Sequence, residues 1–195
     1  MKTRSKALLL TLCAVLLVAA TIFGTMAYLT STDTVTNTFT VGKVNIKLDE
    51  AKANPDGSLV ANADRVKANS YKLLPGHTYS KDPMVTVLSG SESSYVKMTV
   101  TFSKANELDA IFAPDGANLT SIFSGYDAAN WIAKGNTKDA AANTRTYEFW
   151  YKEAVAAPTA DVALDALFDS ITVPGTITGE QLETIKGMTI TVNAY

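Results

Sequence analysis

The side chains that most often carry catalysis or bind metal are scarce in this chain of 195 residues. His77 is the only histidine, and it follows a Pro-Gly pair, so we expect a solvated turn residue. A zinc helix of the HExxH type needs two histidines four residues apart on one face, which a single histidine cannot supply. Cys13 is the only cysteine and lies within an apolar N-terminal run. The sequence therefore predicts no metal and no cofactor.

Serines and carboxylates give no catalytic pattern either. The serine cluster 89–94 has no paired base and no GxSxG elbow, so we interpret it as a polar hairpin loop between two strands. Nineteen acidic residues are present, but their spacing singles out no pair suited to glycoside hydrolysis. Asp56-Gly57 and Asp115-Gly116 resemble turns more than calcium loops. The sequence predicts that the protein is not an enzyme.

Two tryptophans are the remaining candidates for a binding site. Trp131 and Trp150 would mark a carbohydrate or partner site if their rings were exposed. Aromatic residues at strand positions are more often part of the core of a β-sandwich. A monomeric glycan-binding sandwich or adhesin therefore stays an alternative function.

The N-terminal segment has the composition of a cleavable signal peptide. Three basic residues precede an apolar run of about 16 residues from Ala7 to Ile22, which is shorter than a typical membrane span. Small residues then stand two apart at Thr25 and Ala27. We expect cleavage between Ala27 and Tyr28, so residues 1–27 form the signal peptide and residues 28–195 a single domain. The membrane is then a partner only through the uncleaved signal.

Removal of the signal changes the charge and the cysteine content. Lys2, Arg4 and Lys6 leave, so 14 basic residues remain against 19 acidic ones. A mildly acidic chain without a basic cluster argues against nucleic acid as a partner. Without Cys13 the exported domain has no disulfide and depends on its core. Such a domain is typical of a Gram-positive surface protein.

Alternation of apolar and polar residues predicts a mainly β domain. Residues 95–102 alternate best, with Val96, Met98, Val100 and Phe102 on one face. Turn residues at 54–57 and 75–76 separate further strands. The predicted strands also include 39–48 (with a break at Gly42), 84–88, 146–155, 171–173 and 188–195.

Helices are expected to be short and few. Residues 106–112 fit two helical turns, and Thr178 with Gln181 fits a capping box. We interpret residues 113–143, rich in Gly, Asn, Asp and Ala, as a long excursion from the sheets. The pattern predicts an all-β fold, an antiparallel jelly-roll-like β-sandwich of about eight strands with a few short helices in the loops.

The residues around the expected cleavage site resemble the start of TasA/camelysin precursors, which are processed by the signal peptidase SipW. The resemblance covers both ends of the chain but not residues 105–144. It rests on these segments: Gly24-Thr25-x-Ala27 before Tyr28; Asn37-x-Phe39-x-x-Gly42-x-Val44-x-Ile46-x-Leu48; Leu74-Pro75-Gly76 with Lys81-Asp82-Pro83 and Val85–Val87; and 95–100, 167–174 and 190–195.

This resemblance implies a secreted jelly-roll subunit of a bacterial surface or biofilm-matrix fibre. Its partners would be copies of itself, a SipW-type signal peptidase and other matrix proteins. Members of the TasA type polymerise by giving the segment after the cut to a neighbour's sheet. Here that donor strand would be residues 28–37, with Tyr28, Leu29, Thr30, Thr32, Thr34, Val35, Thr36 and Asn37 as the polymerisation residues.

The camelysin branch of the family leaves a second alternative, a cell-surface metalloendopeptidase. That function implies a zinc site, for which His77 and scattered carboxylates are too few ligands. Related proteins also run several residues past the equivalent of Tyr195, which leaves the extent of the last strand open.

Overall fold

The computed structural model describes residues 3–29, 42–112 and 122–195, with the backbone alone for residues 22–29. The chain divides into two compact units, one ending at Val41 and one beginning at Gly42. Each unit is described by itself below.

The N-terminal unit contains one helix, α1, Thr3–Leu29. Its stretch Thr3–Thr21 is long and apolar enough to cross a membrane, and its described side chains are almost all exposed. A signal sequence has the same properties, so the helix is compatible with the predicted signal peptide. Thr25, Ala27, Tyr28 and Leu29 lie in the last two turns of α1, whereas the other predicted donor residues, 30–37, lie outside the described residues.

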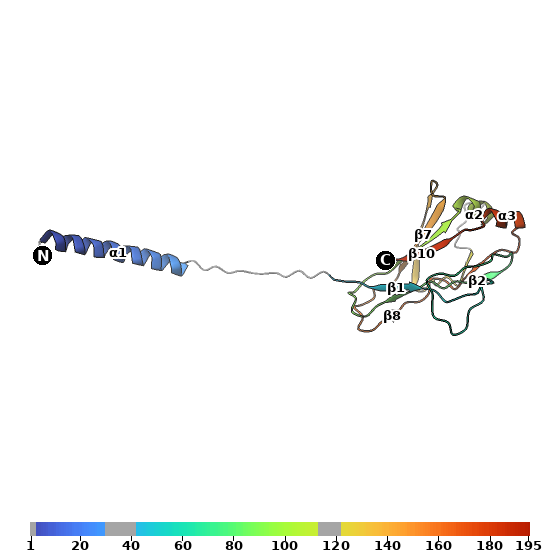
Figure 1. Ribbon diagram of the computed structural model, residues 1–195, viewed down its shortest axis with the longest axis horizontal. Helices are drawn as coiled ribbons and strands as arrows, with labels where there is room; N and C mark the ends of the chain where they lie inside the picture. The colour runs from blue at the N-terminus through green and yellow to red at the C-terminus, as the bar shows by residue number, and fades with distance from the viewer. Residues whose placement is uncertain (1–2, 30–41, 113–121) are drawn as a thin grey trace. The chain divides into compact units, whose positions relative to one another are not determined.

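The unit from Gly42 onward is all-β with two short helices (Figure 1). Its strands form three antiparallel sheets, with orders β1-β3-β8, β10-β4-β7-β6 and β2-β9-β5. The strands are β1 Ile46–Asp49, β2 Thr78–Ser80, β3 Met84–Val87, β4 Lys97–Ser103, β5 Phe123–Ser124, β6 Trp131–Asp139, β7 Thr144–Tyr151, β8 Val162–Ala163, β9 Ser170–Thr172 and β10 Ile190–Ala194.

The two three-stranded sheets are parts of one continuous layer. Strand β2 runs on into β3, and β8 runs on into β9, with antiparallel pairing at both ends. Between them, the Lys81 N–H donates to the Asp169 C=O at 3.0 Å, and the Leu167 N–H donates to the Pro83 C=O at 3.1 Å. One bent strand pair therefore spans both sheets, and eight strands in effect form two facing layers of four.

The core lies between the two layers and confirms the predicted alternation. In β4, Met98, Val100 and Phe102 are fully buried, while the residues between them are half-buried on the outer face. The Phe102 ring stacks on Phe123 at 5.7 Å, which joins β4 of one layer to β5 of the other. The buried core side chains also include Tyr79, Val85, Val87, Val96, Leu108, Trp131, Tyr147, Phe149, Leu167, Phe168, Ile171 and Ile185.

Three sequence predictions about local structure are wrong. Residues 113–143 are not only an excursion, because β6 pairs with β7 along nearly its whole length. Its polar composition hid it, since only Trp131 of its nine residues is buried. The serine cluster 89–94 is a loop but not a hairpin, because β3 and β4 belong to different sheets. Residues 42–45 are irregular, so the described part of the first strand begins only at Ile46.

Both short helices were predicted correctly. Helix α2, Ala105–Phe112, buries Ala105 and Leu108. Helix α3, Gly179–Thr184, has the expected capping box: the Gln181 N–H donates to Thr178 Oγ1, and the Thr178 N–H donates to the Gln181 side chain. The turns at 54–57 and 75–76 are also present, with Gly57 and Gly76 at positive φ.

Candidate functional site

The free edge of β10 is the feature of the domain most suited to binding another chain. Tyr195 and Lys97 exchange both backbone hydrogen bonds, at 2.8 and 2.9 Å, and Ser103 donates to Thr189. In an antiparallel pair this pattern turns every second residue toward the partner strand. The N–H and C=O groups of Ile190, Val192 and Ala194 therefore point away from β4, and no described residue pairs with them.

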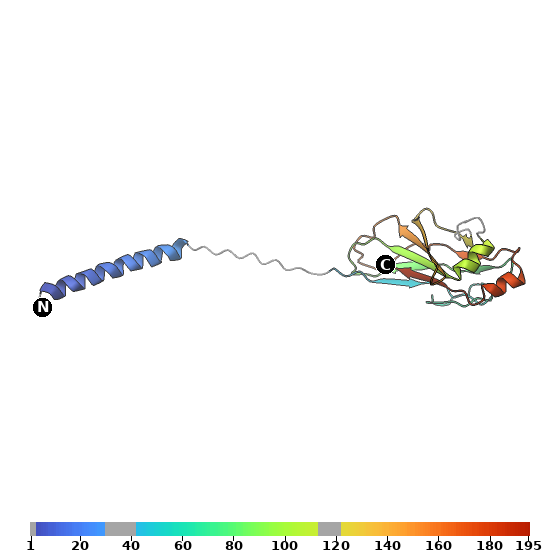
Figure 2. The ribbon, with the colours of Figure 1, turned by 90° about the horizontal axis from the view of Figure 1, so that it is seen from above.

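The adjacent edge of β1 lies close to β10 but does not pair with it. Figures 1 and 2 both show the two strands on the same side of the domain. The Leu88 N–H donates to Asn45, so the backbone groups of Ile46 and Leu48 face away from β3. We call this side the open seam and define it by six apolar residues: Val44, Ile46, Leu48, Ile190, Val192 and Ala194. Val44 is 47% exposed, and the other five are half-buried against the core.

The opposite edge of the same sheet is built differently. Strand β6 carries Lys134 and Lys138 and has a bulge between Ala133 and Gly135. Charges and bulges are the usual means by which natural proteins prevent strand addition at an edge. Strand β10, with the sequence Ile-Thr-Val-Asn-Ala, has no charge, no proline and no bulge. Strand β6 therefore has features that hinder the addition of a strand at its edge, and β10 lacks them.

A cluster of ion pairs fixes β1 at the end of the open seam. Arg65 reaches Asp49 at 2.5 Å and Asp82 at 2.7 Å, and Lys81 pairs with Glu50 in a buried contact. Burial by itself would raise the pKa of Asp49, but hydrogen bonds from Lys47 and Arg65 outweigh it and hold this pKa below the usual range. These carboxylates are all paired, so the cluster is best explained as a structural anchor for residues 50–69.

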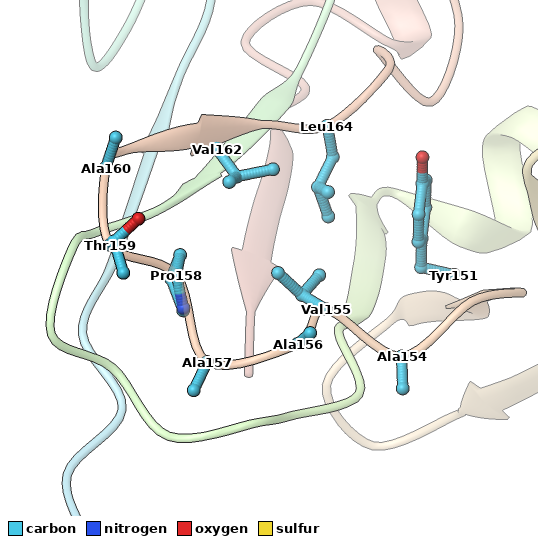
Figure 3. A pocket seen from close by; sticks show the side chains of 10 residues that line it. All are labelled: Tyr151, Ala154, Val155, Ala156, Ala157, Pro158, Thr159, Ala160, Val162 and Leu164. Carbon is cyan, nitrogen blue, oxygen red and sulfur yellow. The ribbon is translucent and has the colours of Figure 1, made fainter.

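The surface hollows offer little chemistry. One, of about 500 Å³, lies beside the β7–β8 connection, where Val155, Val162 and Leu164 point toward the same space (Figure 3). Its lining of alanine, valine, leucine and proline includes no charged side chain. The only polar side chains there are the Tyr151 and Thr159 hydroxyls, and Tyr151 is hydrogen-bonded to Asp165 at 3.2 Å. This hollow has no acid, base or nucleophile in a catalytic arrangement.

Metal ligands do not gather in the described parts of the chain. No group of three or more His, Cys, Asp or Glu side chains there is placed to hold an ion. His77 is exposed in the Pro-Gly turn, with its ring 6.3 Å from that of Tyr79. Cys13 is exposed on α1. Nothing in the described residues therefore supplies the site that a zinc peptidase needs.

The two tryptophans lie on opposite faces of the sheet. Trp131 is 1% exposed, packs edge-on against Tyr151 and donates from Nε1 to the Asp165 C=O at 3.0 Å. The proposal that Trp131 marks a surface site is therefore wrong. Trp150 lies on the outer face, half-buried, with Nε1 donating to Glu148 at 2.6 Å. Only Trp150 remains available to a ligand.

Sequence reasoning predicted a donor strand but named no edge that could accept it. It named the donor, residues 28–37, of which only Tyr28 and Leu29 fall within described residues, at the end of α1. It did not name the open seam, although the alternation and lack of charge at 188–195 were visible. Which strand lies at an edge is not recorded in a local pattern.

The chain matches no protein-family profile, no characterised protein and no solved structure.

Proposed function

We propose that the protein is a secreted structural subunit of a bacterial surface or biofilm-matrix fibre, polymerising by strand donation. In this proposal residues 28–37 of one subunit pair with the open edge of β10 in the next. The proposal rests on the free edge of β10. That edge has no charged residue and no β-bulge, and no described residue pairs with its outward backbone groups. An edge of this kind is a template for an added strand.

The order of the described strands supports a jelly-roll-like sandwich in which none of them fills one of the positions. We count β2 and β3 as one strand and β8 and β9 as another. Four pairings then match those of an eight-stranded jelly roll. In one layer β2/β3 pairs with β8/β9, which pairs with β5; in the other β10 pairs with β4, which pairs with β7. In a jelly roll the first strand also lies beside the last. Here β1 pairs with β3 instead, so the place beside β10 is left for another strand.

The predicted donor has a suitable composition. Thr30, Thr32, Thr34 and Thr36 with Leu29 and Val35 give a β-prone segment without charge except at Asp33. Pairing would satisfy three N–H and three C=O groups of β10 and would cover the half-buried side chains of the open seam. Because donation runs from the head of one subunit to the tail of the next, it does not close and yields a filament.

Cleavage after Ala27 would act as the switch for assembly. In the uncleaved chain the first two residues of the predicted donor, Tyr28 and Leu29, are the end of α1, a helix with the length and composition of a membrane span. A donor tethered in this way cannot be handed to a neighbour. We therefore propose processing by a SipW-type signal peptidase and a location outside a Gram-positive cell, at its surface or in its matrix.

The direct test compares two mature chains by electron microscopy and sedimentation. One begins at Tyr28, and the other begins at Thr38 and so lacks the proposed donor. We expect fibres only from the longer chain, and we expect a synthetic peptide of residues 28–37 to bind the shorter one. Equal assembly of the two chains would disprove strand donation.

The metallopeptidase alternative has no observation in its favour among the described residues, where no metal-binding group is found. A caseinolytic assay of the purified protein with added zinc and a chelator control would test it directly.

A further inference from the structure

Three of the exposed large apolar side chains gather at one end of the outer face of the four-stranded sheet. The cross-strand neighbours there are Tyr195 of the β10 end, Lys97 of β4, Trp150 of β7 and Ile132 of β6. Continuing the alternation of β4 back by two residues from Lys97 places Tyr95 on the same face, where it adds a second exposed ring. We call these five residues the aromatic row. Tyr95 is 65% exposed, Tyr195 63% and Ile132 39%.

The aromatic row is held in place by polar contacts on its own face. The Lys97 ammonium lies 4.9 Å from the centre of the Tyr195 ring and 3.7 Å from a carboxylate oxygen of Glu148. The other oxygen of Glu148 accepts the hydrogen bond from Trp150 Nε1 at 2.6 Å. These contacts restrain Tyr195 and Trp150, so binding a ligand on them costs little side-chain entropy.

A polar hollow of about 230 Å³ adjoins the aromatic row through Glu148. It lies over β6 and β7 at the bulge and is lined by Lys134, Gly135, Asn136, Thr137, Thr146 and Glu148. Gly135 has φ +114°, and a Cβ placed there would meet nothing within 4 Å, so the missing side chain leaves open space. Thr146, which lines the hollow, is hydrogen-bonded to Thr101 of the neighbouring strand at 2.9 Å, so hydroxyl groups continue across the sheet toward β10.

We propose that this face binds a polysaccharide chain of β-linked pyranose sugars. The C–H face of a pyranose ring stacks on the negative face of an aromatic ring, and its hydroxyls bond to amide, hydroxyl and carboxylate groups. Tyr195 and Trp150 lie two strands apart, about 10 Å by the usual strand spacing, which is close to the length of a disaccharide. The hollow then receives the hydroxyls or the N-acetyl group of the next sugar.

The charges of the face argue against other ligands. Lys97 and Lys134 stand beside Glu148, and the outer positions between them and β10 are threonine, serine and asparagine. A nucleic acid would need a dense cluster of cations against its phosphates. A protein strand would be taken up at a sheet edge rather than on a face. A neutral chain of sugars fits both the aromatic rings and the hydroxyl groups.

The experiment measures co-sedimentation of protein, purified after expression of the full chain, with insoluble cellulose and insoluble chitin. The wild type is expected to bind at least one of them saturably. The double variant Trp150→Ala/Tyr195→Ala should lose on the order of tenfold in affinity. The variant Trp150→Phe/Tyr195→Phe keeps the rings and should bind within about twofold of the wild type. Leu59→Ala, which removes a 58% exposed side chain elsewhere, serves as the matched control and should change nothing.

Several outcomes would overturn the proposal. One is that the wild type is not retained on either polysaccharide. A second is that the folded alanine variant is retained as well as the wild type. A third is that the phenylalanine variant loses as much affinity as the alanine variant. The proposal does not rest on fibre formation, so the variants are also imaged by electron microscopy. If the alanine variant is folded, forms no fibres and is retained on the polysaccharides like the wild type, the face is a contact between copies of the chain, and the polysaccharide proposal fails.

Discussion

A proline at the open edge of β10 tests strand donation without removing the donor. Ala194 is half-buried, and its N–H points away from β4, so Ala194→Pro removes a donor that no described residue uses. Proline is tolerated at edge positions of this kind, where the N–H that it replaces would face solvent. The folded domain should therefore lose less than about 1 kcal/mol of its free energy of unfolding.

The magnitude expected for assembly follows from the hydrogen bonds at the edge. Ile190, Val192 and Ala194 offer three N–H and three C=O groups, so an added strand gains up to about 6 kcal/mol at ~1 kcal/mol each. Proline removes one bond and leaves a carbonyl of the incoming strand unsatisfied, which costs about 1–3 kcal/mol per contact. Because 1.4 kcal/mol is a factor of ten, the critical concentration for fibre growth should rise roughly ten- to a hundredfold.

The assay is sedimentation of mature protein over a concentration series, with thermal unfolding of each variant measured beside it. Asn193→Pro is the matched control, because the backbone of Asn193 faces β4 opposite Thr99. Asn193→Pro should lower the melting temperature clearly more than Ala194→Pro does. If Ala194→Pro is folded and grows fibres at the wild-type critical concentration, β10 is not the acceptor and the argument from its edge is wrong.

Three further predictions concern the domain itself. The pKa of Asp49 is lower in the folded protein than in the unfolded chain. Its ionised form therefore stabilises the fold above pH ~4, and this stability should be lost as the pH falls through the folded pKa. Thermal melts of the wild type and of Arg65→Ala from pH 7 to pH 2 should show a smaller loss of stability in the variant, which lacks the arginine partner. Phe149→Ala, at a site 1% exposed, should cost about 3–5 kcal/mol in chemical denaturation. Thr178→Ala removes the α3 cap and should cost about 1 kcal/mol by the same assay, while Thr178→Ser should cost almost nothing.

Elements with a strong local pattern were predicted well. Strand β4 alternates without a break, and the Thr178 capping box satisfies its own backbone groups, so neighbouring residues suffice to specify each. Strand β6 was missed because its outer and inner positions are both mostly polar. It is a strand because β7 provides backbone partners along its length, which a local pattern cannot show.

Trp131 and Trp150 show the same division for the candidate sites. The sequence places Trp150 in a β-prone segment but Trp131 in a polar stretch that predicts no strand, so it does not show which of the two rings is buried. Pairing of β6 with β7 buries Trp131 against Tyr151 and sends Trp150 outward to Glu148. The aromatic row follows from strand register alone, since Tyr195, Lys97 and Trp150 are far apart in sequence.

The sequence by itself determined the apolar N-terminal segment, the all-β class, the short helices and the scarcity of catalytic side chains, because these follow from composition and from periodicity within a few residues. Only the tertiary structure decided that β10 ends the sheet with an edge to which no described strand pairs, and that β1, although close to it, pairs with β3 instead. Hydrogen bonds between strands join residues distant in sequence, so an open edge is a property of the assembled sheet and not of the strand that forms it.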